Sequence, residues 1–329
     1  MSQETLLSIK DLRIHYCLHN STVCAVNGVS LEIQKGETFG LVGETGAGKT
    51  TISLGILRLL PDPPAKVIEG SIEFEGRDLL KLPEAEMRKI RGNNISMIFQ
   101  DPMTALNPID TVGDQILEGI LLHEEIGKAA AREKVYEILE LVGIPRDRYG
   151  EYPHQFSGGM KQRIVIAMAM VCHPDLLIAD EPTTALDVTI QAQVLEMIDN
   201  IKAELGSSML LITHDLGVIA EMCERVGVIY AGQIVEIGTT EQIFNKTSHP
   251  YTVGLFGAIP TLDTKVERLK PIDGLMPDPA NLPQGCKFSP RCPRKLDICE
   301  EKEPELKELG DGHSCRCYLS QKEGRKTDG

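Results

Sequence analysis

Short apolar runs alternate with segments of helical periodicity along the first 255 residues. Three runs, ETFGLV, LLIAD and MLLIT, lack the polar alternation of a half-exposed strand, which is typical of strands buried on both faces of a sheet. Apolar residues recur at helical spacing in KVYEILELVGI, and again after Ser157 at Ile164, Ala167 and Met168. The pattern predicts an α/β fold with a buried sheet.

The pattern changes after about residue 255. Proline, cysteine and charged residues replace the apolar periodicity there, and no long Gly/Ser linker or short-period repeat occurs in the sequence. We therefore expect one domain over residues 1–255 and a C-terminal extension over residues 256–329.

Composition and charge narrow the classes of function. The longest apolar run, IVIAMAMVC at residues 164–172, is far shorter than the ~20 residues that cross a bilayer, and the N-terminus lacks the features of a signal peptide. We expect a chain that is neither secreted nor membrane-spanning and that lies in a reducing compartment, where disulfides are rare. The net charge of -14 disfavours a broad contact with nucleic acid.

GETGAGKT, residues 43–50, follows a predicted strand and precedes a predicted helix that starts near Lys49. This context and spacing match the phosphate-binding loop G-x-x-x-x-G-K-[ST], whose glycines let backbone N–H groups surround phosphates. Lys49 is expected to reach the β and γ phosphates, and the Thr50 hydroxyl is expected to bind Mg²⁺. The predicted nucleotide-binding residues are Gly43, Glu44, Thr45, Gly46, Ala47, Gly48, Lys49, Thr50 and Thr51.

Two carboxylates end the apolar run LLIADE at residues 176–181. The carboxyl end of a buried parallel strand is where such sheets bind ligands. Asp180 is expected to hold the Mg²⁺ shell, and Glu181 to polarise the attacking water as a general base. An acidic pair at a strand end is often only a helix cap or a turn, so this interpretation depends on the phosphate loop.

A second glycine motif, FSGGMKQR, places Ser157 at the predicted N-cap of a helix. The open end of this helix, with Gly158 and Gly159, is a second anion site. Because one triphosphate rarely needs two such sites, we expect this surface to face the nucleotide held by a partner. The motif alone would also fit an ordinary capped helix.

The ordered set GETGAGKT, FQDP, SGGMKQR, LLIADE, TTALD and THD resembles the ATP-binding subunits of ABC transporters over residues 5 to about 245. The resemblance implies a P-loop NTPase core of ABC type with an antiparallel β subdomain and a helical subdomain at about residues 101–160. It also implies ATP as substrate and Mg²⁺ as its metal.

The resemblance carries further roles onto residues of this sequence. Gln100 would sense Mg²⁺ and the transporter interface, and residues 157–161 would be the signature. Asp187 would belong to the D-loop, His214 would contact the γ phosphate, and Tyr16 would stack on the adenine ring.

FQDPMTALNP, FSGGMKQR and HPYTVGLFGAIP followed by GCKFSPRCP look like the ATPases of dipeptide and oligopeptide importers, a branch that includes nickel importers. The resemblance implies that ATP-driven dimer closure powers uptake, at the cytoplasmic face of the membrane. The implied partners are a paralogous ATP-binding subunit, two permeases and an extracellular binding protein, with no nucleic acid.

Two alternatives stay open at this point. The permeases and the binding protein select the solute, so an importer of nickel or another small solute is the first alternative. A soluble ABC ATPase of DNA repair, chromosome structure or translation is the second. It is disfavoured because the chain has one cassette, no sustained heptads and an acidic balance.

The C-terminal extension is rich in thiols. Gaps of five, six and fifteen residues separate the cysteines of a predicted metal site, Cys286, Cys292, Cys299 and Cys315. These gaps fit neither the knuckles of structural zinc nor a ferredoxin run, so spacing leaves a cluster, zinc, and unliganded thiols or a disulfide open. The similar importers carry this cysteine pattern, and some hold iron-sulfur clusters, which implies a 4Fe-4S cluster here.

Cys317 is an alternative fourth ligand, and Cys315 is preferred because His313 gives the family's terminal H-x-C pattern. The extension has too little apolar content for a core of its own, so the expected role of the cluster is to fold it, with redox regulation as the alternative.

Overall fold

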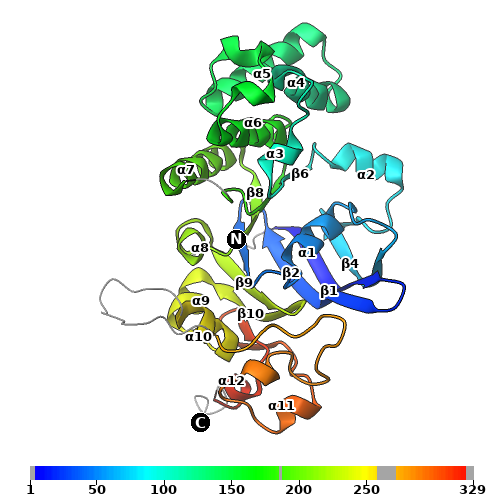
Figure 1. The fold of residues 1–329 in the computed structure, drawn as a ribbon, viewed down its shortest axis with the longest axis vertical. Coiled ribbons are helices and arrows are strands. Elements are labelled where there is room, and N and C mark those ends of the chain that lie inside the picture. Colours follow the sequence, from blue (N-terminus) through cyan, green and yellow to red (C-terminus); the bar gives the residue numbers. More distant parts are fainter. Residues whose placement is uncertain (1–3, 185–186, 258–271, 324–329) are drawn as a thin grey trace. The chain divides into compact units, whose positions relative to one another are not determined.

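The computed structural model describes residues 4–184, 187–257 and 272–323 (Figure 1). Ala185 and Leu186 of the TTALD motif and residues 258–260 of HPYTVGLFGAIP lie outside them. The described residues form two compact units. We call residues 7–32, 39–80, 213–257 and 272–323 the sheet unit, and residues 4–6, 33–38 and the described part of 81–212 the helical unit.

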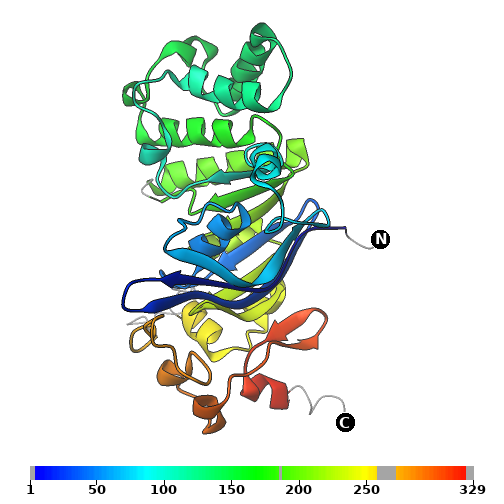
Figure 2. The same ribbon diagram turned by 90° about the vertical axis from the view of Figure 1, so that its right-hand side faces the viewer.

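An antiparallel sheet forms one part of the sheet unit. Its strand order is β2-β1-β4-β5, with bounds β1 Thr5–Cys17, β2 Thr22–Gln34, β4 Ala65–Phe74 and β5 Arg77–Asp78. Leu7 pairs with Phe74 and Tyr16 with Ala65 across β1 and β4. β1 and β2 lie side by side as a long hairpin, drawn in blue in Figure 2. This arrangement agrees with the expected antiparallel β part of the fold.

Further strands of the sheet unit follow the order β11-β12-β10-β9-β3. β3 (Thr38–Val42) pairs in parallel with β9 (Arg225–Tyr230), and β10 (Gln233–Thr239) pairs antiparallel with β9 and with β12 (His313–Cys315). β11 (Lys307–Gly310) lies beside β12. Every residue of β3 is buried, as expected for a parallel strand covered on both faces.

Helices of the sheet unit are mostly short. They are α1 (Lys49–Ile56), α8 (Leu216–Met222), α9 (Thr240–Asn245), α10 (Pro250–Gly257), η3 (Ser289–Arg291), α11 (Ile298–Glu301) and α12 (Tyr318–Glu323). Asp215 caps α8 by accepting from the N–H groups of Gly217 and Val218.

The helical unit contains three parallel strands, β6 (Ile95–Ile98), β7 (Leu176–Asp180) and β8 (Ser208–Ile212), all of whose residues are buried. Its helices are α2 (Glu84–Ile90), α3 (Pro102–Ala105), α4 (Val112–His123), α5 (Lys128–Leu141), η1 (Arg146–Gly150), η2 (Pro153–Gln155), α6 (Gly158–Met170) and α7 (Val188–Leu205).

The elements predicted from apolar patterning are confirmed. ETFGLV, LLIAD and MLLIT form β3, β7 and β8, and KVYEILELVGI forms much of α5. The helix predicted near Lys49 begins at that residue. In the part of the chain that the structure describes, no helix combines the length and the apolar character needed to cross a bilayer. The predicted domain limits, residue 255 and residues 101–160, stay predictions.

Candidate nucleotide and thiol sites

The GETGAGKT loop joins the buried end of β3 to the first turn of α1. Lys49 folds back over the loop, where its Nζ donates to the carbonyl oxygens of Gly43 at 2.7 Å and Glu44 at 3.1 Å. The Lys49 side chain is buried, although it belongs to a residue type that is almost never fully buried without partners. The ammonium is therefore kept inside the loop, close to where phosphates bind in this motif.

Glycines at two positions of the loop are required by its surroundings. A Cβ on Gly43 would lie 2.2 Å from the carbonyl oxygen of Ile229, and one on Gly48 would lie 2.4 Å from that of Ala25. Gly48 also has a φ of 104°, in a region that side chains disfavour. The loop can therefore pack against β2 and β9 only if these two positions are glycine.

Tyr16 lies on β1 with its hydroxyl 3.5 Å from Oγ1 of Thr51. The structure thus brings the predicted adenine-stacking residue to the end of the phosphate loop. His214 is exposed, two residues after the end of β8 and next to the cap residue Asp215. Its role at the γ phosphate stays a prediction.

The carboxylates that end LLIADE lie in the helical unit. Asp180 is buried at the end of β7. Glu181 has a left-handed φ of 49°, and its N–H donates to the carbonyl of Ile212 at 2.8 Å. Its Oε2 accepts from Nε2 of Gln100 at 2.9 Å and from Oγ1 of Thr184 at 3.0 Å. Two predicted residues, Gln100 and Glu181, are therefore hydrogen-bonded to each other, and Thr184 is a second donor to Glu181.

Ser157 caps α6 as predicted, since its Oγ accepts from the N–H of Met160 at 3.4 Å. Ser157 and Gly158 are exposed. Gln162, one turn along α6, donates to the carbonyl of Pro182 at 2.6 Å. This bond ties the signature helix to the segment that follows Glu181.

The predicted nucleotide residues divide between the two units. Tyr16, the GETGAGKT loop and His214 belong to the sheet unit. Gln100, the signature, Asp180, Glu181 and Asp187 belong to the helical unit. Asp187 is exposed at the N-cap of α7, where its side chain makes no capping bond.

Four thiols line one small cavity of the sheet unit: Cys286, Cys292, Cys299 and Cys317. Cys315 is directed elsewhere, because its buried Sγ lies 3.6 Å from Oγ of Ser320. Burial raises the pKa of the Cys286 thiol to about 11, and also raises the pKa of Cys292 and Cys315. Over the described ranges, no three His, Cys, Asp or Glu side chains are grouped so as to hold a metal ion.

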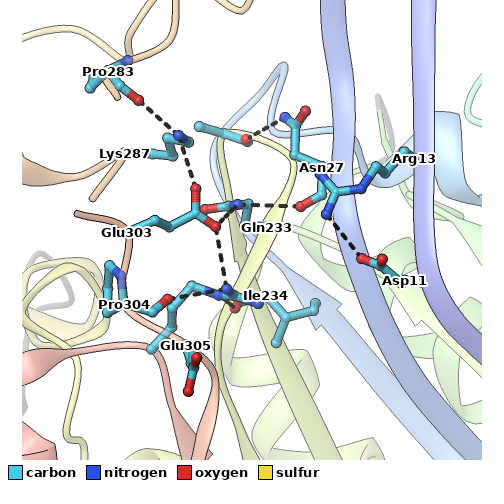
Figure 3. A network of polar contacts seen from close by, with 12 residues as sticks. Asp11, Arg13, Asn27, Gln233, Ile234, Pro283, Lys287, Glu303, Pro304 and Glu305 are labelled. Carbon is cyan, nitrogen blue, oxygen red and sulfur yellow. Dashed lines mark hydrogen bonds and ion pairs between the residues drawn. The ribbon is translucent and has the colours of Figure 1, made fainter. Parts of the chain in front are cut away.

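The C-terminal segment, residues 272–323, contacts the start of β10 (Figure 3). Glu303 accepts from Nε2 of Gln233 at 2.7 Å and pairs with Lys287 at 3.0 Å. Gly232, beside Gln233, donates its N–H to the carbonyl of Ala47 at 2.9 Å. These contacts connect the thiol-bearing segment with the phosphate loop.

Sequence reasoning missed Thr184, Tyr251 and Arg291 as neighbours of the predicted residues. Thr184 stands three positions after Glu181, a spacing that could have suggested the contact. The other two lie more than 200 positions from the phosphate loop, and no local pattern marks their contacts with Glu44.

Comparison with known proteins gives two family matches. The ABC transporter family matches residues 26–184, and the C-terminal region of oligopeptide/dipeptide transporters matches residues 235–299. The solved dimer of the ATP-binding cassette MJ0796 bound to ADP and Pi aligns with a TM-score of 0.64 and 25% identity, over 71% of this chain and 98% of that chain. The fold is that of an ABC ATPase cassette.

Curated relatives cover nearly the whole chain. It is 53% identical to the dipeptide transport ATP-binding protein DppD of Bacillus subtilis, over 96% of this chain and 95% of that protein. It is 48% identical to the oligopeptide transport ATP-binding protein AppD of the same bacterium, over 97% of this chain and 98% of that protein.

Proposed function

The chain belongs to the ATP-binding proteins of dipeptide and oligopeptide ABC transporters, and we propose that its ATP hydrolysis drives peptide uptake. The observation that carries this proposal is the phosphate loop of the sheet unit, in which the buried Lys49 ammonium is held by loop carbonyls. Within the helical unit, Gln100 holds the carboxylate of Glu181, which supports a role for Glu181 as the base. Its near full-length likeness to peptide transport proteins supports the substrate class.

In the proposed reaction, backbone N–H groups of the GETGAGKT loop and the start of α1 bind the phosphates, with Lys49 on the β and γ phosphates. Glu181 accepts the proton of the attacking water, and Gln100 and Thr184 orient its carboxylate. Tyr16 stacks on adenine, and His214 contacts the γ phosphate.

The proposed Mg²⁺ ligands are Thr50, Gln100 and Asp180. Hydroxyl, amide and carboxylate oxygens are hard donors that suit this ion. When bound, Mg²⁺ neutralises charge that develops on the transferred phosphoryl group.

The second half of each ATP site comes, in this proposal, from another ATP-binding subunit. Ser157, Gly158 and Gly159 would face the nucleotide on the partner's loop, and Asp187 would lie at the same interface. We propose a paralogous ATPase as this partner, with two permeases, an extracellular binding protein and a peripheral place on the cytoplasmic face of the membrane. The proposed cassette spans residues 1–255, and the proposed extension spans residues 256–329.

Solute uptake tests the proposal directly. In cells that lack the gene for this chain, labelled dipeptide and labelled pentapeptide uptake should be lost and should return with the wild-type gene. Radioactive Ni²⁺ uptake should not change in the same cells. Loss of Ni²⁺ uptake with intact peptide uptake would replace peptide by nickel as the solute.

We also propose that the thiol cavity holds a 4Fe-4S cluster, as the family resemblance implies. Four thiols line the cavity, which is the number and type of ligand that the cluster requires. The cavity has a volume of about 20 Å³, near that of one water, so it would have to widen to take the cluster. Cys292 directly follows η3 and Cys299 lies in α11, and such short turns constrain the sulfurs less than strands would.

Cys317 replaces Cys315 as the fourth ligand in this proposal, because Cys317 lines the cavity and Cys315 contacts Ser320. Anaerobically purified protein should contain about four irons per chain. Cys317→Ser should lose most of this iron, whereas Cys315→Ser and the control Cys17→Ser should keep it. A colourless wild-type protein with stoichiometric zinc would contradict the cluster, and the reverse order of the two serine variants would restore Cys315.

A further inference from the structure

The phosphate loop carries a negative charge of its own. Glu44, the second residue of GETGAGKT, places a carboxylate on the loop that is expected to receive a polyphosphate. Like charges a few ångströms apart repel by an amount that matters for binding, since water screens them incompletely near a protein surface. An uncompensated Glu44 would therefore oppose ATP binding.

Arg291 compensates this carboxylate from the C-terminal segment. Its Nη1 lies 3.1 Å from Oε1 and 3.0 Å from Oε2 of Glu44. The side chain of Arg291 is only 6% exposed, so solvent screens the ion pair weakly. The two residues are 247 positions apart in sequence.

The backbone of the C-terminal segment fixes the position of the Arg291 guanidinium. Nε donates to the carbonyl of Asp273 at 3.0 Å, and Nη2 donates to that of Ile272 at 3.3 Å. Nη1 also donates to the hydroxyl of Tyr230 at 3.3 Å. The guanidinium is thus preorganised toward Glu44 and has donors left for this contact.

Glu44 is held through its backbone as well. Its N–H donates to the hydroxyl of Tyr251 at 3.0 Å. The buried ring of Tyr251 packs against Tyr230 and Phe288, with centroids 4.6 Å and 5.4 Å apart. Phe288 and Arg291 come from the same short turn of the C-terminal segment, so that turn supports both attachments of Glu44.

We propose that Arg291 is a positioning residue for ATP binding: it neutralises and fixes Glu44, so that the phosphate loop accepts the triphosphate. This inference rests on the proposed role of the loop in binding ATP. It assigns to the C-terminal segment a role in nucleotide affinity that is separate from the proposed 4Fe-4S cluster.

A charge-rescue cycle tests this role. Affinity for Mg-ATP is measured by calorimetry on the full-length chain for wild type, Arg291→Gln, Glu44→Gln and the double variant. Arg291→Gln should weaken binding by about tenfold, the order expected for one uncompensated charge near a polyphosphate. Glu44→Gln removes the charge that Arg291 neutralises and gives the reference affinity for the double variant. Adding Arg291→Gln to Glu44→Gln should change the affinity by no more than about twofold, because the repelling charge is gone.

Three control variants accompany this test. Arg291→Lys keeps the charge and should retain most of the affinity. Lys295→Gln removes an exposed positive charge from the same segment, where Lys295 pairs with Glu300, and should leave affinity unchanged. Lys49→Ala should abolish binding; failure of wild type itself to bind ATP would instead count against the proposed function.

Two results would overturn the inference while wild type still binds ATP. One is an Arg291→Gln affinity equal to that of wild type. The other is an equal loss of affinity in Arg291→Gln and in the double variant, which would mean that Arg291 only holds the C-terminal segment in place.

Discussion

Glu181 is held in a conformation that side chains rarely adopt. Its φ of 49° lies in the left-handed region, at the point where β7 ends. Such backbone persists where surrounding contacts enforce it, and here the N–H bond to Ile212 and the bonds from Gln100 and Thr184 do so. The residue is thus restrained through both its backbone and its carboxylate.

Thr184→Val tests the restraint on the Glu181 carboxylate. The substitution removes the donating hydroxyl and keeps the β-branched shape. We expect kcat for ATP hydrolysis to fall roughly fivefold with KM for ATP within about twofold, because the base loses orientation while the nucleotide contacts stay. Steady-state kinetics of the assembled transporter measure both constants.

Thr5→Val is the matched control, since it removes an exposed hydroxyl that contacts Gln34 on a neighbouring strand. Its kinetic constants should equal those of wild type. A Thr184→Val enzyme with raised KM and unchanged kcat would show that Thr184 serves binding and not the base.

The structural position of a residue could be predicted where the neighbouring sequence determines it. Lys49 begins α1 and Ser157 caps α6 through their own backbone and nearest neighbours, so the local sequence was sufficient to predict these positions. The Glu44–Arg291 ion pair and the choice between Cys315 and Cys317 depend on how distant segments pack. Spacing holds no information of that kind.

At the start of α6, packing within the described chain does not require glycine at position 158. A Cβ on Gly159 would lie 2.9 Å from Cγ2 of Ile190, so Gly159 is restricted by α7. A Cβ on Gly158 would meet no atom of the described chain within 4 Å. An exposed glycine beside an exposed cap residue leaves the helix end accessible to a ligand on another subunit.

Photo-crosslinking at this helix end tests the proposed composite site. With p-benzoylphenylalanine in place of Ser157, ATP should induce a crosslink to the phosphate-loop peptide of the partner ATPase in the assembled transporter. The same probe in place of Leu122, which is exposed on α4, should give no ATP-dependent crosslink to that peptide. Equal crosslinking with and without ATP at position 157 would contradict ATP-driven closure.

Apolar patterning predicted β3, β7 and β8 because strands buried on both faces leave a continuous apolar run. The C-terminal strands β11 and β12 were not predicted. They are short, and β11 is mostly exposed, so their sequence lacks any periodic signal. β12 pairs with β10, a strand about 80 positions earlier in the chain, and β11 pairs with β12.

On the scale of the whole molecule, the C-terminal segment contacts the phosphate loop. β12 pairs with β10, Glu303 contacts Gln233 at the start of β10, and Arg291 contacts Glu44 of the phosphate loop. The sequence suggested a separate extension with its own metal site. The structure shows that this segment also contacts the loop that is expected to bind ATP.

Peptide uptake should depend on ATP hydrolysis by this chain, and Glu181→Gln tests this dependence most directly. In proteoliposomes that contain the transporter with its binding protein, ATP hydrolysis and labelled dipeptide uptake are measured in the same preparation. The variant should bind ATP as wild type does, because Lys49 and Thr50 are untouched, but hydrolysis and uptake should both fall by at least about a hundredfold. ATP hydrolysis at the wild-type rate in the Glu181→Gln transporter would contradict this role of Glu181. Peptide uptake that continues after ATP hydrolysis is lost would contradict the coupling of the two.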